Sequence, residues 1–329
     1  MAATLSLFSE CEAPEPKRLT GVARQAAQAT TLDTRNTVRY AGLAARSILN
    51  RCDSARVPFA WTLNPYRGCE FGCQYCYARY THEFMELRGS TDFERQIFVK
   101  QRAAALLKRD LHRVGAEEWI ALGTATDPYQ PAERHYRVTQ SLLEVFAEGE
   151  GRKLSITTKS ALVTRDLTLL QRIAGRNQLH IGITVTSMEA ALARALEPRA
   201  PLPDVRMGAV AKLAECGLEV GVMCAPVLPG ITDSRAALQA VAEAASRAGA
   251  RFFHAQALFL QPAAQARYFP FLAEHYPALL ERYGRAYARS AYLPASYTGR
   301  LRARVAQIRR ACGLDGGGAG RTGATTAVR

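Results

Sequence analysis

The chain has 329 residues, of which 48% are hydrophobic and 22% are charged, and its 43 Lys and Arg against 29 Asp and Glu give a formal charge of +14. This composition excludes a disordered or fibrous protein, and the length suits one large α/β domain or two smaller ones. No apolar run reaches the ~20 residues of a membrane helix, and the apolar stretch at the start is too short for a secretory signal. We therefore expect a cytoplasmic protein without a membrane partner.

The two ends of the chain differ in composition from its centre. Residues 1–35 mix Pro, Ala, Thr and charged residues without a sustained period, which predicts a loose, flexible N-terminal arm. Residues 313–329 are rich in Gly and predict a flexible, disordered tail. We expect the working domain to span residues 36–312, with an Arg-rich helical extension over residues 265–312.

Inside this domain, short apolar runs alternate with longer amphipathic stretches. The apolar runs, read as strands, are 58–63, 119–124, 153–159, 180–186, 218–227 and 251–260. The helix-like stretches between them are 102–115, 138–149, 165–176, 204–217 and 235–249, several of which end at a Gly in the position of a helix C-cap. This alternation predicts an α/β fold with a parallel sheet, and six strands suit an open or partial (β/α)6 barrel better than a complete eight-stranded one.

The ends of these strands are where functional residues are expected. In parallel α/β folds, ligands bind at the C-terminal ends of the strands and in the loops that follow. The first strand lacks the Gly-x-Gly-x-x-Gly pattern after it, which counts against an ordinary dinucleotide site.

Three of the eight cysteines lie within eight residues, in the loop after the first strand. Cys69, Cys73 and Cys76 have the spacing Cys-x3-Cys-x2-Cys, and thiolates are the usual ligands of iron–sulfur clusters. A set of three thiolates leaves one metal position for a substrate or cofactor, whereas structural zinc sites use four protein ligands. The alternative is a zinc site completed by His82 or Cys52, in a non-catalytic zinc-binding protein.

This loop, with Tyr75 just before the third cysteine, resembles that of the radical S-adenosylmethionine (radical SAM) superfamily. The resemblance implies a [4Fe–4S] cluster held by Cys69, Cys73 and Cys76, with SAM chelating the fourth iron through its amino and carboxylate groups. One electron, from a flavodoxin-type or ferredoxin-type donor, then cleaves SAM to methionine and a 5′-deoxyadenosyl radical, which abstracts hydrogen from a substrate. The cofactor supplies the difficult chemistry, and the protein positions it and excludes water.

Four further segments resemble a subgroup of this superfamily, the DNA repair photolyase-like proteins around spore photoproduct lyase. They are 123–134, 157–166, 196–201 and 225–233, and the resemblance runs from about Asn36 to Leu260. It implies a lyase-like enzyme whose substrate is nucleic acid. Peptide and small-molecule substrates remain alternatives, although the other five cysteines form no second cluster motif.

The resemblance assigns cofactor contacts to two loops. After the second strand, the backbone carbonyls around Gly123 and Thr124 would accept the methionine ammonium of SAM, with Asp127 as the nearest carboxylate. Asp127 equally suits a cap on the helix that follows. After the fifth strand, backbone groups of Pro226 to Gly230 would line the adenine.

Further cofactor contacts are expected at the third and fourth strands. Lys159 ends the third strand where the subgroup has a SAM-contacting Lys, and the alternative is a solvated rim residue. Thr184 and Thr186 match a Ser/Thr position used for SAM. Arg199 is a candidate bidentate partner of the SAM carboxylate, with Glu197 orienting it.

Catalytic candidates follow from the same resemblance. Tyr75 and Tyr77 flank the third cysteine, where the subgroup's tyrosines take part in SAM binding and radical return; packing around the cluster is the alternative. The subgroup's cysteine hydrogen donor at the end of the second strand is absent here, since the sequence reads Gly-Thr-Ala-Thr. Cys224 is a substitute candidate, although a strand cysteine is usually a buried apolar residue. His254 is either a substrate base or a packed strand residue.

Half of the net charge lies in residues 281–310, which contain eight arginines and one acidic residue, Glu281. Four tyrosines, Tyr283, Tyr287, Tyr292 and Tyr297, interleave with these arginines, as in a surface that stacks bases and binds phosphates. A closing amphipathic helix with a solvated Arg face explains the same residues, and 37 Arg against six Lys over the whole chain also indicates a compositional bias.

Overall fold

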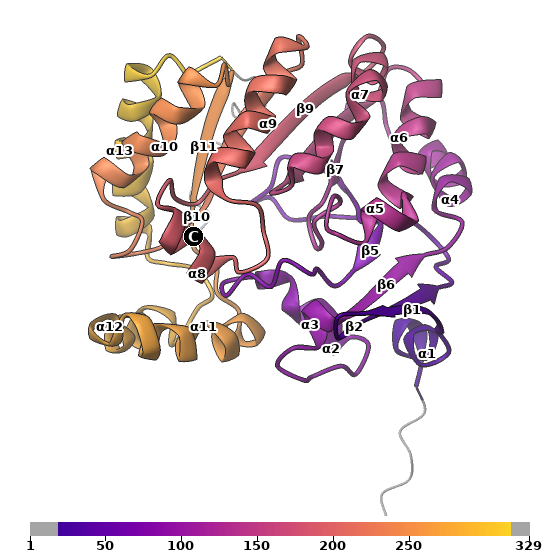
Figure 1. Cartoon of the computed structure of the whole chain (residues 1–329), viewed down its shortest axis with the longest axis horizontal. Helices are drawn as coiled ribbons and strands as arrows, with labels where there is room; N and C mark the ends of the chain where they lie inside the picture. Colours follow the sequence, from indigo (N-terminus) through magenta and orange to yellow (C-terminus); the bar gives the residue numbers. More distant parts are fainter. Residues whose placement is uncertain (1–18, 317–329) are drawn as a thin grey trace, which may run out of the picture.

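Six parallel strands form a curved sheet at the centre of the chain, which the computed structural model describes over residues 19–316 (Figure 1). The strands lie in the order β11–β10–β9–β8–β7–β4, and a short antiparallel strand, β3, closes the β4 edge. Their bounds are β3 Leu49–Arg51, β4 Trp61–Leu63, β7 Trp119–Leu122, β8 Lys153–Thr158, β9 Gln178–Thr184, β10 Val220–Val227 and β11 Phe252–Ala257. The predicted α/β fold with a six-stranded partial barrel is confirmed.

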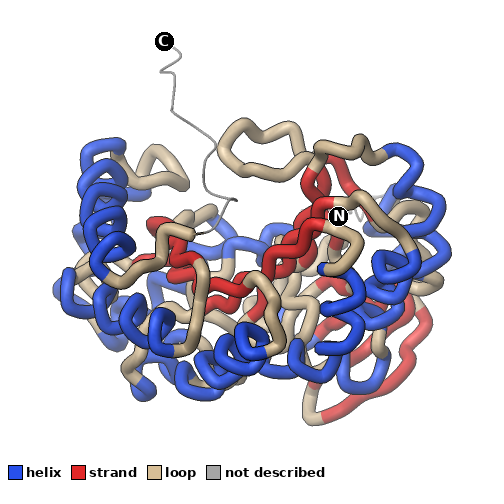
Figure 2. The backbone as a smooth tube through the Cα atoms, turned by 90° about the horizontal axis from the view of Figure 1, so that it is seen from above, coloured by secondary structure: helices blue, strands red, loops and turns tan. Residues whose placement is uncertain are grey.

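The predicted helices follow these strands, and Figure 2 shows the strands as a curved array with helices along its outer side. Their bounds are α4 Ala103–Asp110, α6 Val138–Glu148, α7 Leu167–Ala174, α9 Pro203–Glu215 and α10 Arg235–Arg247. Shorter helical segments lie in the loops: α5 Glu133–Tyr136, α8 Ala190–Leu196 and the 3₁₀ turns 77–79, 111–113 and 161–166. Among residues 19–316, no helix combines the length and apolar character needed to cross a membrane.

The two faces of the sheet differ in character. On β8, Leu154 and Ile156 are buried and alternate with the half-buried Ser155 and Thr157. Because successive side chains of a strand point to opposite faces, one face packs on the helices and the other lines the concave interior. Burial of each large aliphatic side chain contributes about 1.5–3 kcal/mol, so the helix-facing side supplies most of the stability and leaves the concave side to polar groups.

A second sheet lies beside the barrel and was not expected. It has the order β1–β2–β6–β5, with bounds β1 Thr30–Arg35, β2 Val38–Leu43, β5 Tyr66–Arg67 and β6 Gln96–Lys100, and it is accompanied by α1 Gly21–Ala27, α2 Tyr80–Glu83 and α3 Asp92–Arg95. Residues 21–35 are therefore ordered as α1 and β1, which corrects the prediction of a loose arm over residues 1–35. Its first part, residues 1–18, lies outside the described residues.

Three helices form the C-terminal extension: α11 Pro262–His275, α12 Pro277–Tyr287 and α13 Ala295–Ala311. Helix α13 buries Leu301, Val305 and Ile308, and the chain then continues along the sheet edge. Leu314 is buried and Asp315 pairs with Phe252 as an isolated bridge, which corrects the expected start of the flexible tail at residue 313. Residues 317–329 lie outside the described part of the chain.

The turn that ends β7 requires glycine, which gives a test of the fold. Gly123 has a φ of +96°, and a Cβ there would lie 2.5 Å from the carbonyl oxygen of Thr157. We expect Gly123→Ala to lower the free energy of unfolding by about 1–3 kcal/mol for the backbone conformation, with the clash adding to it. Chemical denaturation measures the change.

The control is Gly151→Ala, because Gly151 also has a positive φ, +70°, but no heavy atom of the described chain lies within 4 Å of an added Cβ. Equal losses of stability in the two variants would contradict the steric argument.

Candidate active site

The cysteine loop lies after the C-terminal end of β4 in the barrel sheet, and β5 of the second sheet comes directly before it. Cys69 and Cys73 are buried and Cys76 is partly buried. The loop enters through Gly68, whose φ is +81° and whose added Cβ would lie 2.7 Å from the carbonyl oxygen of Phe93. The Cys69 amide donates to that same oxygen at 2.9 Å. The tight turn therefore needs glycine, and it fixes the first cysteine against the segment before β6.

The loop after β7 clamps the backbone of the cysteine loop. Gln130 Nε2 and Thr126 Oγ1 both donate to the carbonyl oxygen of Gly68, at 3.1 and 2.6 Å, and Gln130 Oε1 accepts from the Glu70 amide at 3.0 Å. The Glu70 carboxylate accepts from the Tyr40 hydroxyl at 2.9 Å. Since these groups are buried, each unmade bond would cost the desolvation of a polar group, so the loop has one favoured conformation.

The three thiols influence one another. Burial raises the pKa of Cys69, and the neighbouring Cys73 and Cys76 raise it further. Burial also raises the pKa of Cys73 to about 12, against the opposing charge of Lys159. A positively charged metal centre would stabilise the thiolate forms of these three cysteines, because thiolates are the metal-binding form.

The chemistry of the donor set suits an iron–sulfur cluster. Cys69, Cys73 and Cys76 bring three thiols into one short loop, and thiolates are the ligands that iron–sulfur clusters take. Within residues 19–316, no group of three His, Cys, Asp or Glu side chains forms a single-ion site.

The two residues weighed for a zinc site have other environments. The Nε2 atom of His82 lies 2.9 Å from the Gln96 carbonyl oxygen, and its ring packs edge-on against Phe93 and Phe98. Burial lowers the pKa of His82 to about 4. Cys52 follows β3, and its amide bonds to the Ala60 carbonyl. His82 is thus a packed core residue.

A buried ion pair lies beneath the cysteine loop. Glu197 and Arg206 form an ion pair in which both side chains are only 1% exposed. Arg206 also donates to the Thr184 carbonyl at 3.0 Å, and Glu197 accepts from the hydroxyls of Tyr75 and Thr186. This network joins the end of β9 to α9 and to the residue before the third cysteine.

Lys159 points into this network from the end of β8. Its Nζ lies 5.7 Å from the centre of the Tyr75 ring. Burial alone would lower the pKa of Lys159, but the opposing charges of Cys73 and Glu197 outweigh that effect and raise it. The ammonium therefore faces the cysteines and is not a solvated rim residue.

Asp127 has a structural role. Its carboxylate accepts from the Thr158 hydroxyl at 2.6 Å and from the amides of Lys159 and Tyr129 at 2.7 and 2.9 Å. Burial raises its pKa, although these bonds oppose the shift. Asp127 thus ties the β7 turn to the end of β8. It caps no helix, because residues 128–132 form turns and α5 begins only at Glu133.

Thr124 and Tyr77 meet at the mouth of the barrel. The Tyr77 hydroxyl donates to the Thr124 carbonyl, and Asn64 donates to the Thr124 hydroxyl at 3.0 Å. Tyr77 is 39% exposed, whereas Tyr75 is 5% exposed. A carbonyl oxygen has two lone pairs, so Thr124 keeps one acceptor site for an ammonium.

Arg199 lies against the cysteine loop. A Cβ added at Gly72, whose φ is +65°, would meet Arg199 Nη2 at 3.1 Å, and the Arg199 amide donates to the Phe71 carbonyl at 3.3 Å. On the sequence alone, Glu197 is expected to orient Arg199. In the structure, the Glu197 carboxylate pairs with Arg206 instead. Arg199 is exposed, and its guanidinium lies beside Gly72 of the cysteine loop.

The remaining cofactor candidates lie at the ends of neighbouring strands. Thr184 is buried and pairs with Met223 of the neighbouring strand β10. Pro226 is the next-to-last residue of β10 and follows a cis peptide bond. Thr186, rather than Thr184, makes the hydroxyl contact with Tyr75, at 3.1 Å.

Cys224 does not face the concave interior. It shares one face of β10 with Val220 and Val222, and all three are fully buried in the large core that contains the helices. Its thiol contacts the Thr186 carbonyl at 3.9 Å, and burial raises its pKa to about 12. This burial disfavours Cys224 as a hydrogen donor, a role that stays a prediction.

Two of the four C-terminal tyrosines are also buried in the protein rather than exposed to solvent. Tyr283 and Tyr287 are buried, and their hydroxyls donate to the carbonyls of Pro229 and Leu258, both at 2.9 Å. Tyr292 is 42% exposed. The predicted stacking surface is thereby reduced.

Sequence reasoning missed several groups of the site. Arg206, Gln130 and Asn64 were given no role, although each makes the contacts described above. Gln130 lies in the segment 123–134 and Asn64 lies five residues before Cys69, so their places in or beside the motifs indicated a role in the site. Arg206 lies in an ordinary helix, and only the fold reveals its buried partner.

Comparison with known proteins shows the family of the chain. The family model described as the radical SAM superfamily matches residues 63–239. An uncharacterised protein of Mycobacterium tuberculosis is 36% identical over 273 residues, covering 82% of this chain and 80% of the relative, and one of Methanocaldococcus jannaschii is 28% identical over 179 residues, covering 54% and 64%.

Among solved structures, spore photoproduct lyase with bound AdoMet and dinucleoside spore photoproduct aligns with a TM-score of 0.60 at 14% identity, covering 82% of this chain and 78% of that one. At 14% identity, this likeness shows a similar fold alone.

The Glu197–Arg206 pair gives the first test of the site. We expect Arg206→Met to lower the free energy of unfolding by about 3–5 kcal/mol, because it leaves a buried carboxylate unpaired. The control is Arg285→Met, which removes a surface partner of Glu281 and should cost less than about 1 kcal/mol. Similar costs in urea denaturation would contradict the role of the buried pair.

A second test uses pH. The pKa of Glu197 is lowered from its ordinary value of 4.5, because the charges of Arg206 and Lys159 outweigh burial, which alone would raise it. The ionised form therefore stabilises the fold fully above about pH 4.5 and loses this effect as pH falls through the lower folded pKa. We expect the stability advantage of the wild type over Glu197→Gln to shrink below that pH; a constant difference would refute it.

Proposed function

Because the chain belongs to the radical SAM superfamily, we propose that it is a radical SAM enzyme that binds a [4Fe–4S] cluster through Cys69, Cys73 and Cys76 and acts on a nucleic-acid substrate. The observation that supports the cluster assignment best is the clamped loop of three mutually interacting thiols at the C-terminal edge of the partial barrel. A one-electron donor of the flavodoxin or ferredoxin type is the partner that this chemistry needs.

When bound, the reduced cluster and SAM supply a 5′-deoxyadenosyl radical that abstracts hydrogen from a substrate. The residues of the chain hold and orient the cofactor. Arg199, exposed beside Gly72, suits a bidentate contact with the SAM carboxylate. The Thr124 carbonyl suits its ammonium, and Lys159 provides a fixed cation beside Cys73.

Other cofactor contacts are proposed from their places at the strand ends. Gly123 allows a close approach of backbone and ligand, as its φ of +96° demands glycine. Thr184 and the segment at Pro226 lie on the next strands and would contact the ribose or adenine. Asp127 supports this arrangement indirectly by fixing the backbone of Lys159.

The two tyrosines have different proposed roles. Tyr75 is buried and bonded to Glu197 and Thr186, which suits positioning of the cysteine loop. Tyr77 is half-exposed at the mouth, where a substrate can reach it, and it is our candidate for hydrogen return. Hydrogen return by Tyr77 would not use Cys224, whose side chain is buried in the core that contains the helices.

The proposal of a nucleic-acid substrate rests on aromatic and basic groups near Tyr77. The ring of Phe259 lies 5.9 Å from that of Tyr77 and 4.5 Å from that of Tyr292, and Arg56 lies 4.1 Å from the Tyr292 ring. Partly exposed rings next to a guanidinium suit the stacking of bases. The spore photoproduct lyase structures of similar fold contain a dinucleoside ligand.

The cluster assignment is tested by anaerobic reconstitution. We expect about four iron and four sulfide per chain and reductant-dependent formation of 5′-deoxyadenosine from SAM. Cys73→Ala should lose both, whereas the control Cys216→Ala, at the end of α9 outside the loop, should keep both. Retained 5′-deoxyadenosine production in Cys73→Ala, or zinc as the sole metal, would refute the assignment.

The substrate class is tested by isotope transfer. Deuterated DNA and RNA oligonucleotides should transfer deuterium into 5′-deoxyadenosine, and binding should weaken as salt rises. Transfer from a peptide or a small molecule instead would keep the radical chemistry and overturn the nucleic-acid substrate.

A further inference from the structure

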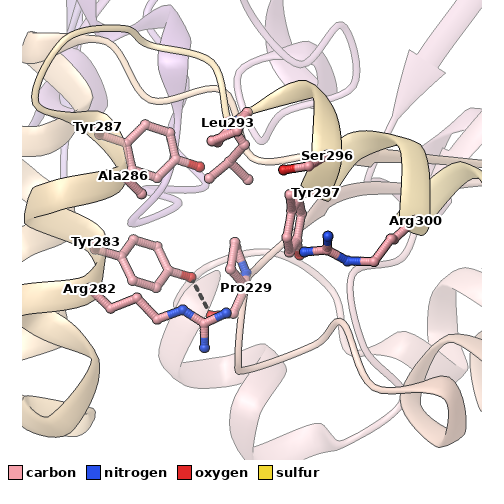
Figure 3. A pocket seen from close by; sticks show the side chains of 10 residues that line it. Pro229, Arg282, Tyr283, Ala286, Tyr287, Leu293, Ser296, Tyr297 and Arg300 are labelled. Carbon is pink, nitrogen blue, oxygen red and sulfur yellow. Dashed lines mark hydrogen bonds between the residues drawn. The ribbon is translucent and has the colours of Figure 1, made fainter.

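A cavity in two parts lies between α12, α13 and the loop after β10 (Figure 3). One part has a volume of about 190 Å³ and is lined mainly by apolar and aromatic groups, among them Pro229, Tyr283, Ala286, Tyr287 and Leu293. The other, of about 200 Å³, is lined by Asp233, Arg282, Tyr297, Arg300, Leu301 and Arg304. Arg282, Tyr297 and Arg300 border both, so the two parts adjoin.

The polar part has an excess of positive charge. Within residues 19–316, Arg282, Arg300 and Arg304 form no ion pair with a carboxylate, and Arg304 donates to the backbone carbonyl of Asp233. The Asp233 carboxylate is already occupied, because it accepts from the Gly230 amide at 2.8 Å and from the Tyr297 hydroxyl at 2.9 Å. Three guanidinium groups around one occupied carboxylate favour an anion with several acceptor oxygens.

The start of α13 adds to this field. Ser296, in the first turn of this 17-residue helix, borders the apolar part next to Tyr297. The positive end of the helix dipole therefore borders the apolar part, next to Arg282 and Arg300, which line both parts.

In the apolar part the rings of Tyr283 and Tyr287 are buried, so the partly buried Ala286 and Tyr297 supply its accessible apolar surface. The Tyr283 hydroxyl donates to the Pro229 carbonyl, as the dashed line in Figure 3 marks, and the Tyr287 hydroxyl donates to the Leu258 carbonyl, both at 2.9 Å. With these polar ends satisfied, the remaining lining favours a flat apolar group. An anion joined to a flat ring is the ligand that matches both parts.

We propose that this cavity binds a nucleotide, with its phosphate among Arg282, Arg300 and Arg304 and its base in the apolar part beside Tyr297 and Ala286. The three arginines come from α12 and α13, outside every segment that we assign to SAM, and the cavity shares only the loop after β10 with those segments. The nucleotide is either free or one unit of a polynucleotide, because both offer a phosphate and a base.

The test measures binding to the reconstituted full-length protein without SAM or reductant, by calorimetry at constant ionic strength. The probes are adenosine 5′-monophosphate, adenosine, inorganic phosphate and the phosphodiester ApA. We expect the monophosphate to bind more tightly than phosphate or adenosine alone. Arg282→Ala/Arg300→Ala should weaken this binding by about tenfold or more, because it removes two charged donors.

The matched control is Arg302→Ala, an exposed arginine of α13 that does not border the cavity. It should change binding less than about twofold, as expected for distant surface charge. Tighter binding of ApA than of the monophosphate identifies a polynucleotide as the source, and the reverse identifies a free nucleotide.

Absence of binding, or an equal loss in Arg302→Ala, would overturn the proposal. Because Arg282 and Arg300 are exposed, both variants should melt like the wild type; a charge-reversed Arg300→Glu that still binds the monophosphate as tightly would also overturn it. Since no radical chemistry enters the measurement, its outcome is independent of the proposed reaction.

Discussion

The buried ion pair between Glu197 and Arg206 is the interaction on which the site depends. Taking two charges out of water costs several kcal/mol per ion, and only close pairing with further hydrogen bonds offsets that cost. Arg206 donates to the Thr184 carbonyl, and Glu197 accepts from Tyr75 and Thr186. The pair thus connects the end of β9 and α9 to the cysteine loop, and it holds a negative charge near Lys159 and Cys73.

The cysteine loop is fixed from several sides by groups that differ in sequence position. Gln130 and Thr126 hold Gly68, the Gln74 amide donates to the Leu196 carbonyl, and Arg79 pairs with Glu94 in a second buried ion pair at 2.9 Å. A preorganised loop reduces the entropic cost of bringing three thiolates to one cluster. The partial barrel contributes by placing these segments at one edge, where the carboxyl ends of its strands meet.

Much of this arrangement could be predicted from the sequence because it depends on local patterns. The six apolar runs gave the six parallel strands, and the cysteine spacing indicated the loop. Strand β1 was missed because its side chains are almost all exposed, so it lacks apolar alternation and is stabilised by pairing with β2. The burial of Cys224 could not be read from the sequence, because the face that a strand residue takes depends on where the strand begins. Arg206 was given no role, because its partner Glu197 lies nine residues away across a turn.

Low-temperature electron paramagnetic resonance of the reduced protein, before and after addition of SAM, tests the central claim most directly. The account predicts the signal of a reduced [4Fe–4S] cluster, and it predicts that SAM changes this signal because three cysteines leave one iron open to the cofactor. A reduced protein with no cluster signal, or a signal that SAM leaves unchanged, would contradict it.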